Sequence, residues 1–281
     1  MPEDTKDLYK KLESTLERYG SMVIACSGGV DSALLAYVAR RVLGTASLAV
    51  LGISPSLAGR EREDAEAFLR EHQIPYELVE TAELENADYR KNHPDRCYHC
   101  KNELFSKLRE IARAHDLEYI AYGANRDDEG DFRPGGRAAR EHRAIAPLAE
   151  AGLGKEEIRR LARSLGLDLW DKPAAPCLAS RIPYYSSVDR AKLEQVEQAE
   201  NALKDAGFSV GRVRHHGDVA RIELPLEDCA RVFMDGMWRS IAEAVKAAGF
   251  LYVTLDLEGF ASGRLNDAID PDARKRAVDP S

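Results

Sequence analysis

Short apolar runs that alternate with longer amphipathic stretches are the feature that most restricts the fold of this chain. The first run, at residues 22–26, is bounded by glycines, and residues 31–42 then carry apolar side chains at helical spacing. The pair recurs downstream, with expected strands at 46–53, 76–80 and 119–122 and expected helices at 58–72 and 101–115. Strands and helices that alternate in this way form right-handed crossovers around a parallel sheet covered on both faces. We therefore predict an α/β fold.

The pattern changes beyond Pro183, after a helix that begins near Gly154 and stops at Gly166. The later elements follow in the order helix 188–206, strands 211–215 and 219–224, helix 237–248 and strand 251–257. The sequence therefore predicts two domains, a parallel-sheet domain at 1–185 and a small α+β domain at 186–281. We expect the second to bind substrate or to mediate oligomer contacts, and the charged segment after Asn266 to be a mobile tail.

Composition and charge narrow the function. The 281 residues are 44% hydrophobic with a formal net charge of -8, and no apolar run approaches the roughly 20 residues needed to span a bilayer. The acidic start lacks the features of a signal peptide, so we expect a cytoplasmic enzyme without a membrane partner. Net acidity argues against a broad nucleic-acid surface and favours a small-molecule substrate. Five cysteines, an odd number, do not indicate a disulfide framework.

A glycine-rich loop lies between the first expected strand and its helix. It reads Ser27, Gly28, Gly29, Val30, Asp31 and Ser32. Glycines let the backbone approach a phosphate, and the helix N-terminus adds free N–H groups. The simpler alternative is a tight turn capped by serine. The loop has neither a Gly-Lys-Ser/Thr ending nor G-x-G-x-x-G spacing. It resembles the signature of the PP-loop ATP-pyrophosphatases, which cleave ATP between the α and β phosphates; that resemblance implies that Asp31 helps to hold Mg²⁺.

Three cysteines suggest a metal centre. Cys97 and Cys100 lie three residues apart at a helix start, and Cys177 lies in a distant loop. Zinc would usually require a fourth ligand, and His99 points away from its flanking cysteines, so an iron–sulfur cluster with one open iron explains the set better. Buried or incidental thiols are the alternative. We expect the other two cysteines, Cys26 and Cys229, to be structural.

Several motifs together resemble one family of the PP-loop group, LarE, across nearly the whole chain. Besides the phosphate loop they are residues 96–101 (RCYHCK), 123–128 (GANRDD), 131–135 (DFRPG), 176–181 (PCLASR) and 255–259 (LDLEG). The resemblance implies a fold like the adenine nucleotide alpha hydrolases and a role in building the nickel-pincer nucleotide cofactor. There the family converts pyridinium-3,5-dicarboxylate mononucleotide to its dithiocarboxylate.

The sulfur source divides this family. In some members a single cysteine, matching Cys177, gives up its own sulfur and becomes dehydroalanine, while others carry three cysteines that hold a [4Fe-4S] cluster. All three are present here, so the chain resembles the cluster-bearing type. Both sulfur sources are chemically reasonable. Adenylation gives the carboxylate a good leaving group, AMP, and either a cysteine thiolate or a cluster-bound sulfide is nucleophilic at neutral pH.

Further site residues follow from strand ends and from the resemblance. We expect Ser54, Gly123 and Asn125 to contact ATP. The segment after Gly123 should face the same crevice as the phosphate loop, although a solvated charged loop is the alternative. Within it we expect substrate contacts from two residues, Asp128 and Arg133.

The second domain contributes a basic group. Arg212 and Arg214 share one strand face and could clamp a phosphate, which the resemblance implies is that of the substrate nucleotide. A charged, exposed edge strand is nearly as simple an interpretation. We expect Arg181, four residues after Cys177, to neutralise a substrate carboxylate in catalysis. The resemblance suggests Glu223 as a metal ligand, with Asp256 and Glu258 as weaker candidates.

Two other functions stay open from sequence alone. The first is tRNA thiolation, since some PP-loop tRNA enzymes use three cysteines, but no basic RNA module is apparent. The second is a nucleotide-sensing protein without chemistry. For the favoured function we expect a nucleotide substrate, a homo-oligomer, and as possible partners a sulfide donor and a nickel-inserting protein.

Overall fold

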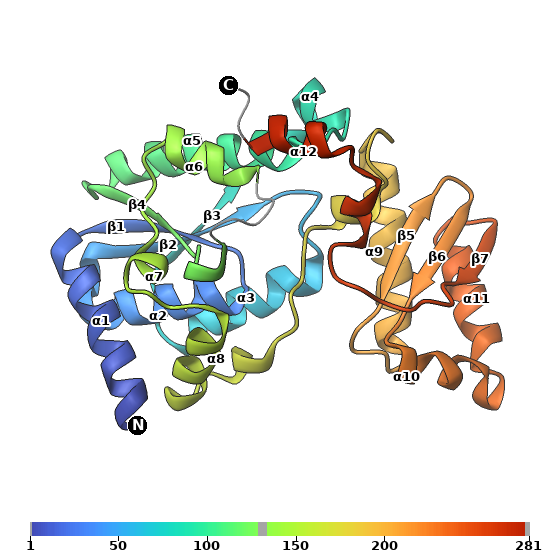
Figure 1. Cartoon of the computed structure of the whole chain (residues 1–281), viewed down its shortest axis with the longest axis horizontal. Helices are drawn as coiled ribbons and strands as arrows, with labels where there is room; N and C mark the ends of the chain where they lie inside the picture. Colours follow the sequence, from blue (N-terminus) through green and yellow to red (C-terminus); the bar gives the residue numbers. More distant parts are fainter. Residues whose placement is uncertain (1, 129–133, 279–281) are drawn as a thin grey trace.

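The structure is a computed structural model and describes residues 2–128 and 134–278. Its first domain is built on a parallel four-stranded sheet with the order β3-β2-β1-β4 (Figure 1). The strands are β1 Met22–Cys26, β2 Ser47–Ile53, β3 Tyr76–Glu80 and β4 Tyr119–Tyr122. The central strand β1 is buried along its whole length, which is why its sequence is continuously apolar and does not alternate. This architecture confirms the predicted α/β class.

Helices cover both faces of this sheet, as Figure 1 shows. One face carries α1 Glu3–Tyr19, α2 Val30–Leu43, α3 Gly59–Glu71, α7 Pro147–Glu150 and α8 Lys155–Ser164. Their apolar side chains, among them Leu16, Leu34 and Ile158, form one core with Ile24 of β1. The other face carries α5 Arg96–Ala114 and α6 Gly135–Glu141, preceded in the chain by the short α4 Ala87–Arg90. Both cores leave free the carboxyl edge of the sheet, where ligands bind in open α/β folds.

The second domain holds a three-stranded sheet with the order β5-β6-β7. Its elements are α9 Arg190–Asp205, β5 Arg212–His216, β6 Val219–Glu223, α10 Leu226–Cys229, α11 Met237–Ala247 and β7 Tyr252–Leu255. Strand β6 runs antiparallel to β5 and parallel to β7. One sheet face, with Val213 and Ile222, packs on α9 and α11. The opposite face carries Arg212, Arg214 and Glu223, since side chains alternate along a strand.

Polar contacts join the domains along α3 and α9. The Gly59 amide donates to Glu197 Oε1 at 2.5 Å, and Arg60 forms an ion pair with Asp205 at 2.5 Å. The linking segment then brings residues 172–189 across the junction (Figure 1).

The sequence missed four short helices, α4, α6, α7 and α10, and was wrong about the expected tail. Residues Pro271–Val278 form helix α12, which returns to the first domain and contacts α6 (Figure 1). There Arg140 Nη2 donates to the carbonyl of Val278 at 3.4 Å. A high charge content alone does not make a tail, because a short helix can bury one small side chain, here Ala277. Of the helices in the described ranges, none has the length and apolar character required to cross a membrane.

Candidate active site

The phosphate loop keeps its shape through its own hydrogen bonds. The Ser32 hydroxyl accepts from the Ser27 amide at 3.0 Å and donates to the Gly29 carbonyl at 3.1 Å. Gly28 has φ +75°, and a Cβ there would lie 2.8 Å from the Cβ of Ala65 in α3. Any side chain at Gly28 would thus be both strained and blocked. The loop presents backbone and hydroxyl donors just before α2, an arrangement suited to phosphate.

The loop after β4 closes onto the phosphate loop. Asn125 is buried, and its Nδ2 donates to Asp31 Oδ2 at 2.8 Å. A Cβ at Gly123 would lie 2.8 Å from the Ser32 amide nitrogen, so glycine is required for this approach. Asp128 accepts from the Asn125 amide at 3.1 Å. The structure therefore brings Asp31, Gly123, Asn125 and Asp128 together, whereas Arg133 and Asp131 lie outside the described residues.

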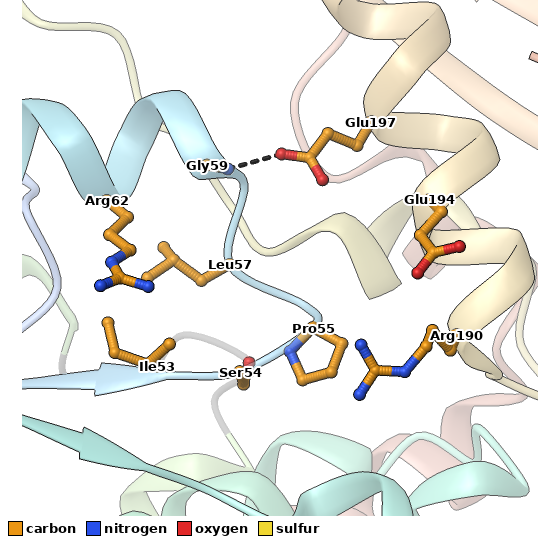
Figure 2. Close-up of a pocket in the computed structure, with 9 residues that line it drawn as sticks. All are labelled: Ile53, Ser54, Pro55, Leu57, Gly59, Arg62, Arg190, Glu194 and Glu197. Carbon is orange, nitrogen blue, oxygen red and sulfur yellow. Dashed lines mark hydrogen bonds between the residues drawn. The ribbon is translucent and has the colours of Figure 1, made fainter.

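A polar cavity of about 220 Å³ opens beside Ser54, at the end of β2 (Figure 2). Ile53, Pro55 and Leu57 give it apolar walls. Arg62 of α3 lines it from the first domain, while Arg190, Glu194 and Glu197 of α9 reach it from the second. A neighbouring cavity of about 320 Å³ shares Ser54 and Arg190 and extends to Thr81. Ser54 thus lies in a cleft formed by both domains, with guanidinium groups on two sides.

The three predicted cysteines act on one another electrostatically. Cys97 and Cys177 are exposed, while Cys100 is partly buried and packs against a cluster that includes Tyr89 and Leu178. Burial raises the pKa of Cys100, and the negative charges of Glu83 and Cys177 raise this pKa further. His99 instead faces Asp95, at 3.5 Å, as expected from its position between the cysteines. Cys26 is buried in β1, consistent with packing.

Four buried arginines hold the loop that carries Cys177. They come from distant parts of the chain and all donate to backbone carbonyl oxygens of residues 174–180. The contacts are Arg96 to Ala179 at 2.9 Å, Arg181 to Pro176 at 2.6 Å and to Cys177 at 3.2 Å, Arg212 to Ala174 at 2.8 Å, and Arg214 to Ser180 at 3.0 Å. Because carbonyl acceptors carry no charge, these contacts concentrate positive charge around an exposed thiol.

Two of these arginines have carboxylate partners. Arg181 forms a two-pronged pair with Glu200 at 2.8 and 3.0 Å, and Arg214 binds one oxygen of Glu223 at 2.7 Å. Arg221 binds the other Glu223 oxygen at 3.0 Å. The structure thus gives both residues protein partners: Arg181 is directed to Glu200 and the loop backbone, and both oxygens of Glu223 accept from arginines. The expected roles of Arg181 toward substrate and of Glu223 toward a metal stay predictions.

Arg96 and Arg212 differ from the other two, since neither has a carboxylate within ion-pair distance in the described part of the chain. Arg212 lies over the Phe260 ring, 5.4 Å from its centroid. Burial lowers the pKa of Arg212, and Arg181 and Arg214 lower it further. Burial also opposes the charge of Arg96, yet the negative charges of Cys97 and Cys177 outweigh it and raise the pKa of Arg96. An anion near either guanidinium would thus be stabilised.

The side chains that could bind a metal are distributed in a way that favours a cluster over a single ion. Across residues 2–128 and 134–278, no three His, Cys, Asp or Glu side chains converge on one ion position. Ligands of a cluster bind different irons and so lie further apart than ligands of a single ion. Three free thiols that influence one another, with a buried cation beside them, fit such an anionic group. Asp31 offers a carboxylate of the kind Mg²⁺ prefers at the phosphate loop.

Sequence reasoning missed two residues of this site, Arg96 and Glu200. Arg96 was visible only as the residue before Cys97, and Glu200 sits in a helix as one of many charges. Only tertiary structure reveals that Arg96 contacts the Cys177 loop and that Glu200 is buried beneath it. Asp256, a weaker candidate, instead accepts from Arg221 at 2.8 Å.

Some known proteins match only the part of the chain that carries the phosphate loop, and others match nearly the whole chain. The sequence profile of the family described as NAD synthase matches residues 5–121. An NH(3)-dependent NAD(+) synthetase of Thermococcus sibiricus is 30% identical over 52% of this chain and 58% of its own length. These matches centre on the domain that carries the phosphate loop and identify it as a PP-loop ATP-utilising domain.

Other relatives match both domains. The uncharacterized protein slr1717 of Synechocystis sp. is 44% identical over 92% of this chain and 98% of its own length. The pyridinium-3,5-bisthiocarboxylic acid mononucleotide synthase of Lactiplantibacillus plantarum is 36% identical over 92% of this chain and 93% of its own length. The chain therefore belongs to the LarE family, the family of that synthase.

Proposed function

We propose that this protein is an ATP-dependent sulfur transferase that converts the carboxylates of pyridinium-3,5-dicarboxylate mononucleotide to thiocarboxylates for the nickel-pincer nucleotide cofactor. The observation that carries the proposal is the exposed Cys177, held by four buried arginines at the junction with the ATP-utilising domain. A sulfur nucleophile is thereby placed in a positively charged setting that suits an anionic substrate.

Activation precedes sulfur transfer. A carboxylate oxygen of the substrate attacks the α-phosphorus of ATP. The bond between this phosphorus and the α,β-bridging oxygen breaks, and pyrophosphate leaves with the electron pair of that bond. In this proposal the phosphate loop from Ser27 to Ser32 binds the pyrophosphate, and Asp31 holds Mg²⁺ against it. Ser54, Gly123 and Asn125 complete the nucleotide site. The position of Ser54 in a cleft lined by Arg62 and Arg190 supports this placement.

Sulfur then attacks the carbonyl carbon of the acyl adenylate. The new carbon–sulfur bond forms as the bond to the bridging oxygen breaks, so AMP leaves with one oxygen of the original carboxylate. Arg212 is the best-supported phosphate contact for the substrate, because its guanidinium is buried without a carboxylate in the described residues. Asp128 and Arg133 remain predicted substrate contacts. Arg214 also remains a predicted contact, although its guanidinium is already paired with the carboxylate of Glu223.

We further propose that Cys97, Cys100 and Cys177 hold a [4Fe-4S] cluster. Such a group, with one iron free of protein ligands, would supply the sulfide for transfer. The residues of the chain hold it, keep it beside the activated carboxylate and balance its charge. The alternative is that Cys177 itself donates: its sulfur attacks, its Cβ–Sγ bond then breaks with loss of the Cα proton, and dehydroalanine remains.

Anaerobic reconstitution of the wild type and of Cys97→Ala, Cys100→Ala and Cys177→Ala tests this proposal. We expect each variant to lose most of its iron and visible absorbance, because two thiolates hold a cluster poorly. AMP formation should persist in all three, since the phosphate loop is untouched. Cys26→Ala, which removes a thiol outside the site, is the control and should match the wild type in iron content and absorbance.

The sacrificial alternative gives a different pattern in the same experiment. Turnover would stop at one sulfur per chain without an iron requirement, and the reacted protein would be lighter by about 34 Da, the mass of H₂S. Cys97→Ala and Cys100→Ala would then be mild. An absence of substrate-dependent AMP formation in the wild type would contradict the sulfur transferase itself.

The expected homo-oligomer has support from exposed apolar side chains. In the described residues, most of those that are large belong to the second domain: Leu226, Phe233, Met234, Trp238, Leu251, Tyr252 and Leu257. Apolar surface of this kind usually marks an interaction site. A sulfide donor and a nickel-inserting protein remain the other predicted partners.

A further inference from the structure

Arg96 stands where the two cysteine-bearing segments meet. It is the first residue of α5, directly before Cys97, and only 4% of its surface is exposed. Its Nη1 donates to the carbonyl of Ala179, two residues after Cys177, and also to Oδ1 of Asn92. A single guanidinium therefore ties the helix of Cys97 and Cys100 to the loop of Cys177.

Asn92 extends this connection. It is fully buried, and its Nδ2 donates to the carbonyls of Ile182, Pro183 and Ser186 at 3.2, 2.8 and 3.0 Å. The pair of Asn92 and Arg96 thus fixes residues 179–186 against the start of α5. This position is specific to Arg96, because the other three arginines reach the loop from residues 181–214 and, among the described residues, form no hydrogen bond or ion pair with α5.

The charge of Arg96 is not balanced by a carboxylate. A buried guanidinium normally has a carboxylate partner, as Arg181 and Arg214 do here, because an uncompensated buried charge costs several kcal/mol or more. Arg96 has no ion pair among the residues the structure describes. Cys97 follows Arg96 directly in the chain, and the Ala179 carbonyl that Arg96 binds lies two residues after Cys177. The buried guanidinium therefore lies between the two cysteine-bearing segments.

We propose that Arg96 is the positioning residue of the three-cysteine site: it holds the Cys177 loop against α5 and supplies the buried positive charge that balances the thiolate-bound cluster. The inference rests on the proposed function. Three thiolates on a cluster core of charge +2 leave a net charge of about -1, and reduction by one electron adds another negative charge. A fixed cation beside the cluster stabilises the reduced form more than the oxidised form and so raises the reduction potential.

Two substitutions separate the two parts of this role. Arg96→Gln keeps hydrogen-bond donors for the Ala179 carbonyl but removes the charge, whereas Arg96→Lys keeps the charge but cannot bind Ala179 and Asn92 with one planar group. Arg113→Gln, in the last turn of the same helix and exposed, is the matched control. Each protein is reconstituted anaerobically, its fold is checked by circular dichroism, and iron per chain and reduction potential are measured.

We expect Arg96→Gln to lose at least half of its iron and to show a lower reduction potential, while Arg96→Lys loses iron but keeps a potential near that of the wild type. Arg113→Gln should match the wild type in both. Unchanged iron content and potential in folded Arg96→Gln would overturn the inference. A wild type that binds no iron after reconstitution would instead contradict the proposed cluster, which keeps the two failures distinct.

Discussion

The phosphate loop and the Cys177 loop carry the two halves of the proposed chemistry, and they are built in opposite ways. The phosphate loop is six consecutive residues whose shape depends on Gly28 and on hydrogen bonds from Ser27 to Ser32. The Cys177 loop depends on side chains from residues 96 to 214. A local loop survives changes elsewhere, whereas an assembled one depends on the docking of two domains. Each of the following predictions tests that difference.

The largest effect is expected from Gly28→Ala. Its φ of +75° is shared by Gly20, but only at Gly28 would the new Cβ meet a neighbour, Ala65. Gly20→Ala therefore controls for backbone strain alone, which costs about 1 kcal/mol at either position. We expect AMP formation to fall about 100-fold or more in Gly28→Ala, because a displacement of about 1 Å at a phosphate site costs that much. Iron binding should stay intact. Equal activity of the two variants would show that the phosphate loop tolerates displacement.

The next effect is on stability. Glu223→Gln removes the carboxylate that two arginines share in a fully buried site. Breaking a buried pair leaves uncompensated charge, so the free energy of unfolding should fall by about 3–5 kcal/mol in urea titrations. The exposed pair of Lys6 and Glu3 provides the control, since Glu3→Gln should change the same quantity by less than about 1 kcal/mol. Similar urea midpoints for Glu223→Gln and Glu3→Gln would mean that the buried pairs of the second domain are not needed to hold the Cys177 loop.

A smaller and more selective effect is expected from Arg212→Gln. Loss of a buried, charged phosphate contact should weaken binding of the pyridinium mononucleotide by about 10-fold to 100-fold. ATP binding should change by less than about threefold, because the phosphate loop lies in the other domain. Calorimetric titration with each ligand measures both, with the exposed Arg239→Gln as the control. Equal losses for the two ligands would place the substrate pocket elsewhere.

The smallest effect concerns pH. Burial, assisted by Lys192, lowers the pKa of His215 below its ordinary value of 6.5, so the folded state favours the neutral ring. Stability from this group is present above pH 6.5 and is lost as the pH falls through the lower folded-state pKa. His215→Gln should therefore flatten the loss of unfolding free energy between about pH 7 and pH 5 by at most about 1 kcal/mol, because only one titrating group is removed. The exposed Gln198→Asn, which removes no titratable group, should leave the slope as in the wild type.

Sequence reasoning succeeded where the determinants are local. The strands at 22–26, 76–80 and 119–122 were predicted at their observed bounds, because short runs of strand-forming residues between turns define them directly. The phosphate loop and the meeting of Asn125 with Asp31 also follow from strand order, since parallel strands end at one edge. The α/β class could thus be predicted from periodicity alone.

The features that the sequence did not reveal concern long-range pairing. No sequence signal indicates that Arg181 would turn toward Glu200, or that Glu223 would bind two arginines. The helical character of residues Pro271–Val278 depends on a surface of α6 that the sequence does not reveal. Each miss arises because a charged side chain has many possible partners, and only the folded chain selects one.

Helix α12 has a consequence for how the two domains move. The chain passes from the first domain to the second near residues 172–189 and then returns near residues 256–270 to place α12 on α6 (Figure 1). A body attached at two points has one easy axis of rotation, which is the line through both attachments. We therefore expect opening of the cleft beside Ser54 to be mainly a rotation about the line through these two connections, because each connection limits how far the domains can slide past one another.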